Sequence, residues 1–442
     1  MVASIAKVPL LRNLATRSLS SSASLHPVGG ISNYEVSNSN VNGVSVCSAE
    51  NNSPLARVSI IFRAGSRYEN DDNQGVAHVL RICAGLTTKS TSQFAITRHI
   101  QQVGASLHCT LDRETIAYTL EGTRSAVEEV IPFLSTVATE QIFRPWELAD
   151  NIKRIRLELA TRPPQLRTID LLHKAAYRKG LGNSLFIAKY NLEKVNSETL
   201  QHYVNCNLTS DKATVVGLGV NHNNLKEYVA CLNFPGTSGQ AVIPSPYKGG
   251  EIRCDKGGNL AYIAIAGEGP GMNNLKQAAA GAVVQKILGS GASVPYGIDH
   301  GMLRQVIKTT EEYAISGLNA NYDETGLVGA MFVAPASVAG QITENVFSTL
   351  KSGRISDEWV ERGKNQLKAS VLMASENGRS VVRKLGQSCA LTGTGLSPTQ
   401  YIGIVESVTS KDVNDVLAKA GSNLSISSFG NLSCVPYLAD LK

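Results

Sequence analysis

The chain contains the stretch Phe133-Leu-Ser-Thr-Val137, with Trp146 nine residues beyond it. It also contains a second version, Val346-Phe-Ser-Thr-Leu350, with Trp359 nine residues beyond it. Corresponding residues of the two stretches lie 213 positions apart, and these two tryptophans are the only ones in the 442 residues. A similar stretch that returns at a fixed offset indicates an internal repeat, so we expect two similar halves.

Other pairs of residues keep nearly the same offset over about 100 positions. They are Glu193-Lys-Val195 with Glu406-Ser-Val408, Asp112-Arg-Glu-Thr115 with Asp323-Glu-Thr325, and Gly219 with Gly430. The halves therefore span residues 28–235 and 251–442. Residues 235–250 hold three prolines and four glycines, which disfavour helix and strand, so we predict a linker at 236–250. The repeat also predicts that Trp146 and Trp359 lie at the starts of equivalent helices.

Apolar periodicity predicts alternating helices and strands within the first half. Apolar sequence predicts strands at 56–63 and 213–219, and alternating apolar residues predict paired strands at 105–110 and 115–121. Helical spacing predicts helices at 74–86, 92–103, 124–138, 146–159, 166–177 and 198–204, with Thr91 or Ser92 as the cap of the second. We therefore expect the α+β class, as two tandem homologous α/β-sandwich domains of about 200 residues each.

Composition excludes several classes of protein. Apolar residues make up 43% and charged residues 18%, which is typical of a globular chain. No run approaches the roughly 20 apolar residues that cross a bilayer. The net charge of +6 is not clustered into a basic face, so nucleic-acid binding is not expected. The eight cysteines form no C-x-x-C pair, which favours buried, reduced thiols.

The N-terminus has the composition of a targeting segment. Lys7, Arg12 and Arg17 precede the first acidic residue, Glu35, and serines cluster from Ser18 to Ser24. Basic, serine-rich and acid-poor sequence is typical of a mitochondrial transit peptide, which we assign to residues 1–25. The chain after it is then expected to work inside the mitochondrion.

Most catalytic motifs are absent from the sequence. There is no phosphate-binding loop, no G-x-S-x-G turn and no H-E-x-x-H, and no two histidines are four residues apart. The glycines of Gly267-Glu-Gly-Pro-Gly271 are expected to form a turn that begins a helix. This segment is either an anion site at a helix N-terminus or a plain turn that binds no ligand, and the second interpretation is favoured.

One segment, Gly75-Val-Ala-His-Val-Leu-Arg-Ile82, carries a resemblance to a known family. Together with the repeat and the transit peptide, it resembles the mitochondrial processing peptidase branch of the pitrilysin metallopeptidases. Active members carry H-x-x-E-H here, in which two histidines bind zinc and the glutamate is the general base. This chain has His78, Arg81 and Ile82 at those positions, and Glu158 falls approximately where the family has its distal glutamate ligand.

The resemblance therefore implies a degenerate metal site. Zinc in catalytic sites takes three protein ligands and a water. Isoleucine offers no ligand atom, and arginine cannot act as a base because it stays protonated. We expect no metal, no cofactor and no catalytic residue, and we expect Arg81 to pair with a carboxylate that the sequence does not identify.

Further short segments extend the resemblance over roughly residues 28–442. They include Ala64-Gly-Ser-Arg-Tyr-Glu69, Asn321-Tyr-Asp-Glu-Thr-Gly-Leu327 and Gly430-Asn-Leu-Ser-Cys-Val-Pro-Tyr437. They are similar to the non-catalytic family members that are built into ubiquinol–cytochrome c reductase, respiratory complex III. That similarity implies a structural subunit on the matrix side, peripheral to the inner membrane, in a dimeric complex with core protein 1, cytochrome b, cytochrome c1 and the Rieske protein.

A second member of the family stays open as an alternative. The regulatory alpha chain of the processing peptidase also lacks a full zinc motif, but in its second half it has a longer, glycine-rich loop that grips the presequence. The expected counterpart here, Gly267–Gly271, has only three glycines, which disfavours that alternative. A catalytic beta chain or an independent soluble peptidase would need the ligands that Arg81 and Ile82 replace.

Overall fold

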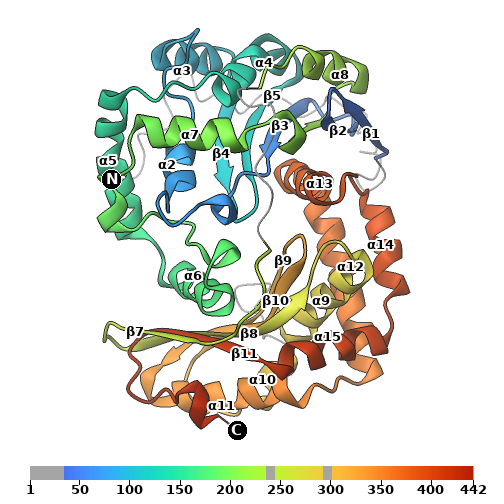
Figure 1. The fold of residues 1–442 in the computed structure, drawn as a ribbon. Helices are drawn as coiled ribbons and strands as arrows, with labels where there is room; N and C mark the ends of the chain where they lie inside the picture. The colour runs from blue at the N-terminus through green and yellow to red at the C-terminus, as the bar shows by residue number, and fades with distance from the viewer. Residues whose placement is uncertain (1–33, 235–243, 292–300, 442) are drawn as a thin grey trace, which may run out of the picture.

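The computed structural model describes residues 34–234, 244–291 and 301–441 as two β-sheets, each covered by helices (Figure 1). The first sheet has the order β1 (Val36–Val41), β2 (Val44–Ala49), β6 (Ala213–Leu218), β3 (Leu55–Phe62), β5 (Ile116–Thr123), β4 (Ser106–Leu111). The second sheet has the order β7 (Glu251–Asp255), β11 (Leu424–Gly430), β8 (Leu260–Pro270), β10 (Thr325–Pro335), β9 (Ala314–Asn321).

The second sheet repeats the topology of the first. Strand β2 pairs with β6 in parallel, and β7 pairs with β11 in parallel. Every later neighbour in both orders is antiparallel, and β1 is an additional strand on the edge of the first sheet. The predicted α+β class, with its architecture built twice, is confirmed.

The helices follow the same repeat. The first half contains α2 (Val76–Ile82), α3 (Gln93–Gln102), α4 (Arg124–Thr139), α5 (Pro145–Thr161), α6 (Pro164–Tyr177), α7 (Ser197–Asn207) and α8 (His222–Ala230). The second contains α9 (Leu275–Leu288), α10 (Met302–Val306), α11 (Ala336–Ser352), α12 (Asp357–Glu376), α13 (Gly378–Thr392), α14 (Pro398–Ser407) and α15 (Ser410–Ser422). Trp146 and Trp359 lie in the first turns of α5 and α12, as the duplication predicts.

Helix ends in the first half are set by local chemistry. Ser92 caps α3 by accepting a hydrogen bond from the Ala95 N–H at 3.3 Å. The predicted helix at 74–86 is too long, because Gly75 and Gly85 adopt φ angles of +94° and +86°. These left-handed values interrupt a right-handed helix, so α2 is confined to Val76–Ile82.

One helix from each half packs against the sheet of the other half. Helix α6 packs on the second sheet, where Leu172 lies in one buried cluster with Ala264 and Leu327. Helix α13 packs on the first sheet, where Val382 lies in one buried cluster with Ile61. Figure 1 shows both helices between the two sheets. Both faces of β3 are therefore covered, which accounts for its nearly continuous apolar sequence.

The prediction that Gly267–Gly271 begins a helix is wrong. Strand β8 continues to Pro270, and α9 begins only at Leu275. A Cβ atom at Gly267 would lie 1.8 Å from the carbonyl oxygen of Ala420 on α15. The glycine therefore allows a helix backbone to approach the strand. This contact was not evident beforehand, because its partner lies 153 residues away in the chain.

Replacing Gly267 with alanine is expected to lower the free energy of unfolding by about 2 kcal/mol, because the new methyl group displaces backbone rather than a flexible side chain. The matched control is Gly403→Ala in α14, where a Cβ meets nothing within 4 Å. That change should stabilise the helix by about 0.5–1 kcal/mol. Urea unfolding of both variants measures the difference, and equal midpoints would contradict this account of Gly267.

The turns at 112–115 and 323–325, which correspond to each other in the repeat, contact each other in the folded chain. The N–H of Asp323, between β9 and β10, donates to both carboxylate oxygens of Glu114 at 3.2 Å. Glu114 lies between β4 and β5 and also binds the buried guanidinium of Arg67. Arg67 reaches Glu324 at 3.3 Å, and Arg63 pairs with Asp323. A charged network thus joins the two halves.

Some sequence predictions fall partly or wholly outside the described residues. The predicted transit peptide at 1–25 lies outside them, and so do residues 236–243 of the predicted linker. Residues 244–250 form neither helix nor strand, and the Ser245 hydroxyl accepts from the Leu181 N–H at 3.2 Å. Within the described ranges, no helix is both long enough and apolar enough to cross a membrane.

The expectation of buried, reduced thiols is only partly right. All eight cysteines are free, and Cys47, Cys83 and Cys389 are buried. Cys231 and Cys434 are exposed, because each lies just beyond the end of α8 or β11, where the chain returns to the surface.

Candidate functional site

Three of the four predicted site residues come together between α2 and α5. His78 and Arg81 are three residues apart and share a face of α2. Helix α5 brings Glu158 to them, and its carboxylate binds the Arg81 guanidinium. His78 Nε2 lies 3.5 Å from Glu158 Oε1. The fourth residue, Ile82, is 2% exposed and belongs to the apolar core of the first half.

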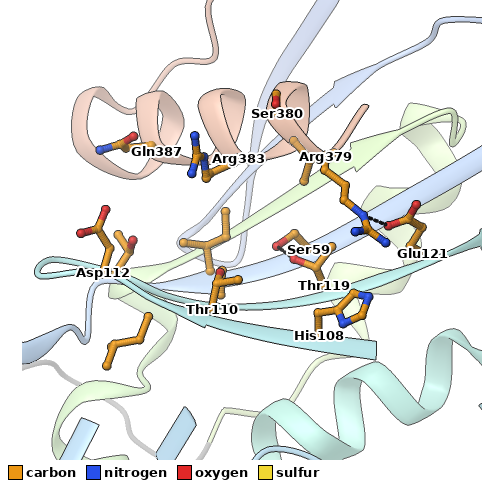
Figure 2. A pocket seen from close by; sticks show the side chains of 15 residues that line it. Ser59, His108, Thr110, Asp112, Thr119, Glu121, Arg379, Ser380, Arg383 and Gln387 are labelled. Atoms are coloured by element: carbon orange, nitrogen blue, oxygen red, sulfur yellow. Dashed lines mark hydrogen bonds and ion pairs between the residues drawn. The ribbon is translucent and has the colours of Figure 1, made fainter. Parts of the chain in front are cut away.

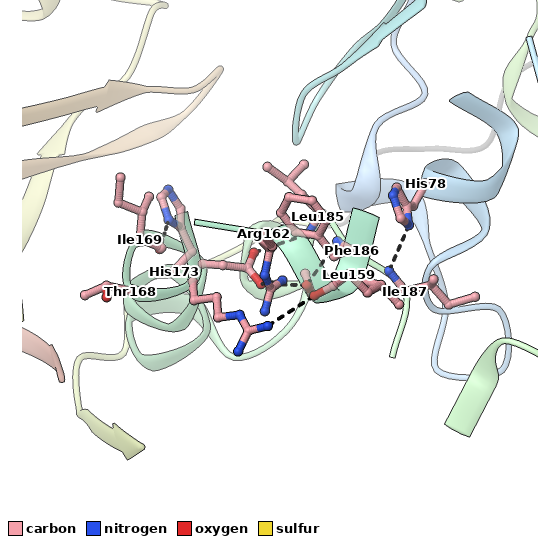
Figure 3. A network of polar contacts seen from close by, with 12 residues as sticks. His78, Leu159, Arg162, Thr168, Ile169, His173, Leu185, Phe186 and Ile187 are labelled. Atoms are coloured by element: carbon pink, nitrogen blue, oxygen red, sulfur yellow. Dashed lines mark hydrogen bonds and ion pairs between the residues drawn. The ribbon is translucent and has the colours of Figure 1, made fainter. Parts of the chain in front are cut away.

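The imidazole of His78 is buried and is oriented by the backbone. Its Nδ1 accepts a hydrogen bond from the Ile187 N–H at 3.3 Å, as Figure 3 shows. The neutral ring therefore carries its proton on Nε2, the nitrogen that faces Glu158. The ring of Phe186 meets the imidazole edge to face, with 5.4 Å between centroids.

A loop before α7 closes the site from outside. The guanidinium of Arg162 lies over the ring of Phe186, 4.5 Å from its centroid. Asp170 on α6 accepts from the Leu185 N–H at 3.2 Å and from the Ser184 hydroxyl at 2.6 Å. These contacts hold Phe186 over His78 (Figure 3). Sequence analysis missed this loop, because no motif marks Phe186 and its role depends on tertiary contact.

Burial and charge set the protonation of the site. Burial lowers the pKa of His78 to about 4, against the opposing charge of Glu158. Burial alone would raise the pKa of Glu158, but the hydrogen bond and charge of Arg81 outweigh it, so that pKa lies below its ordinary value. At neutral pH the site holds a neutral imidazole and an Arg81–Glu158 ion pair.

The residues present do not fit a catalytic metal. Such a site needs three protein ligands and a water. Only His78 and Glu158 offer ligand atoms here, Ile82 offers none, and the Arg81 guanidinium binds the carboxylate that a metal would need. Across the described residues, no three of the histidine, cysteine, aspartate and glutamate side chains are grouped to hold a metal ion. The site is closed by an ion pair.

The buried histidine predicts a pH dependence of stability. The unfolded chain protonates His78 near pH 6.5, whereas the folded chain protonates it only near pH 4. Stability is therefore fully present above pH 6.5 and is lost as pH falls towards 4, by about 3 kcal/mol. His78→Gln should remove that part of the decline in urea unfolding between pH 4 and 7.5. The control His202→Gln, at an exposed position, should keep it, and parallel curves for wild type and His78→Gln would contradict the prediction.

A cleft of about 600 Å³ opens between α13 and the face of β3, β4 and β5 (Figure 2). Glu121 in it binds Arg57 at 2.7 Å and Arg379 at 2.6 Å. The Ser59 hydroxyl bonds to Thr119 at 2.8 Å rather than to His108, the one imidazole among the residues that line the cleft. The cleft therefore offers polar and charged side chains beside apolar ones, but no activated nucleophile.

The repeated architecture and the altered zinc motif on α2 together point to a peptidase scaffold without a complete set of zinc ligands. A family model described as "Insulinase (Peptidase family M16)" matches residues 45–189, and one described as "Peptidase M16 inactive domain" matches residues 194–367. The chain belongs to the M16 peptidase family.

Its relatives include subunits of a respiratory complex. The chain is 36% identical to "Cytochrome b-c1 complex subunit 2, mitochondrial" of Rattus norvegicus, over 90% of both chains. It is 35% identical to the protein of the same name in Homo sapiens, again over 90% of both. It is 26% identical to "Probable mitochondrial-processing peptidase subunit alpha-1, mitochondrial" of Arabidopsis thaliana, over 89% of this chain and 81% of that one.

Proposed function

We propose that this chain is a non-catalytic structural and assembly subunit of respiratory complex III, in the place of subunit 2 (core protein 2) of the cytochrome b-c1 complex. One observation carries the proposal, which is the 35–36% identity to the rat and human subunits over 90% of each chain. The structure supports a non-catalytic role, because Arg81 and Ile82 stand where a base and a ligand are needed.

The proposal includes a location and partners. The chain is expected on the matrix side of the inner membrane, delivered there by the transit peptide at residues 1–25. It would be peripheral, in agreement with the lack of a membrane-crossing helix among the described residues. It would contact core protein 1 and form part of a dimeric complex with cytochrome b, cytochrome c1 and the Rieske protein, supporting electron transport without a cofactor of its own.

A regulatory subunit of the processing peptidase is the second candidate. The 26% identity to a plant alpha subunit favours it less than the identity to the complex III subunits favours the first. The segment Gly267–Gly271 is the expected counterpart of that subunit's glycine-rich loop, but residues 267–270 form the end of strand β8 and not a loop.

Native-gel separation of mildly solubilised mitochondria tests the proposal. The chain is located by antibody, and its co-migrating proteins are identified by mass spectrometry. Co-migration with cytochrome b, cytochrome c1 and the Rieske protein at the size of complex III is expected. A soluble particle the size of two such chains, with one zinc-bearing partner, would overturn the proposal in favour of the processing peptidase.

A further inference from the structure

A second hollow lies on the other side of α13 from the cleft of Figure 2. It has a volume of about 340 Å³, and most of the residues that line it belong to α9, α12, α13 and α14. Arg383 of α13 lines the cleft, whereas its neighbour Lys384 lines the second hollow. Apart from Gln387, which lines both, the two hollows take different residues from this helix.

The walls of this cavity are largely apolar. They include Leu275, Leu367, Val371, Val381, Leu385 and Tyr401. The charged side chains in the lining are Lys286 on α9 and Lys384 on α13, and the lining contains no carboxylate. A cavity of 300–1,000 Å³ with apolar walls and a few convergent polar groups is the usual form of a small-molecule site.

The two lysines lack a counter-charge in the folded chain. Among the described residues, neither Lys286 nor Lys384 forms an ion pair or a side-chain hydrogen bond. Burial lowers the pKa of Lys286, and burial, Arg383 and Lys286 together lower the pKa of Lys384. Both ammonium groups are thus partly desolvated, and the positive charges around them repel. An anion placed between them would relieve both costs.

We propose that this cavity binds a single-chain anionic amphiphile, a long-chain fatty acid, with its carboxylate at Lys286 and Lys384 and its acyl chain along the apolar wall. The volume lies at the small end of ligand cavities, which suits one chain rather than two. Two lysines and no carboxylate in the lining disfavour a cationic ligand. This site is separate from the closed site at Arg81 and from the proposed assembly role.

Binding of dodecanoate to the purified full chain, measured by isothermal titration calorimetry, tests the proposal. We expect saturable binding with one site per chain. Lys286→Gln and Lys384→Gln should each weaken it by about tenfold, because each removes one charge-assisted hydrogen bond. Ala374→Leu keeps both lysines but fills the cavity, and it should abolish binding. The control Lys411→Gln, an exposed lysine on α15 outside the cavity, should leave it unchanged.

Two comparison ligands separate the contributions of head and chain. Dodecanol has the same chain without the charge and should bind at least tenfold more weakly, whereas acetate has the charge without the chain and should not bind. Equal binding of dodecanol and dodecanoate would overturn the proposal, and so would binding that Ala374→Leu leaves intact. The absence of saturable dodecanoate binding by the full chain would overturn it as well.

Discussion

Replacing Arg113 with methionine is expected to lower the free energy of unfolding by about 3–5 kcal/mol. The Arg113 side chain is fully buried and donates to Asp170 Oδ1 at 2.8 Å and to the Leu181 carbonyl at 3.1 Å. Methionine fills a similar volume but donates no hydrogen bond, so the Asp170 carboxylate and the Leu181 carbonyl each lose a charged donor inside the protein. Asp170 keeps only the Ser184 hydroxyl and the Leu185 N–H as neutral donors. Urea unfolding measures the loss directly.

The same change should loosen the loop over His78. Asp170 orients this loop through the Leu185 N–H and the Ser184 hydroxyl, and Arg113 orients Asp170. Hydrogen exchange at residues 181–187 is therefore expected to accelerate more than exchange in the second sheet. The control Arg156→Met breaks an ion pair with Glu193 whose side chains are 61% and 79% exposed, and it should cost less than about 1 kcal/mol. Similar losses in both variants would contradict the role assigned to Arg113.

Changing Arg81 to glutamate and Ile82 to histidine should create a zinc site without creating a peptidase. The double change frees the Glu158 carboxylate and adds a second imidazole four residues after His78 on α2. Without metal, residue 81 would then repel Glu158, so the variant should be less stable than wild type. Zinc at a hundred times its dissociation constant should restore about 2.7 kcal/mol.

Thermal unfolding with and without zinc measures this effect. Wild type should not respond, and Ile82→His alone should respond little, because Arg81 still holds Glu158. No peptide cleavage is expected from the double variant, because a peptidase also needs a substrate-binding surface and a partner chain. Zinc-dependent cleavage would contradict this expectation. It would show that the scaffold retains a working active site although a loop covers His78 and Ile82 lies in the apolar core.

Local and repeated features of the fold were predictable from the sequence. Helices such as α4 and α7 follow from apolar periodicity, and the doubled topology follows from the constant offset between Trp146 and Trp359. The exchange of α6 and α13 was not predictable, because an apolar run in β3 does not say what covers it. The partner of Ile61 is Val382, more than 300 residues later in the chain. Gly267 was misinterpreted for the same reason, since its neighbour Ala420 is distant in sequence.

Only part of the candidate site was predictable from the sequence. His78 and Arg81 lie on one helix, so their shared face follows from their spacing. The pairing of Arg81 with Glu158 needed the packing of α5 on α2, which periodicity does not give. Phe186 and Ile187 were missed because an irregular loop carries no repeating pattern, and only its tertiary contacts reveal that it covers His78.

The helix exchange has a consequence for the order in which the chain is made. The first sheet is complete once Leu218 has been synthesised, but the helix that covers its inner face ends only at Thr392. Until residues 378–392 have followed it, Ile61 lacks the cover that Val382 provides. During this interval the nascent first half exposes an apolar sheet that invites aggregation. The first half therefore reaches its final form only after residues 378–392 are present, whereas the second half finds its borrowed helix α6 already made.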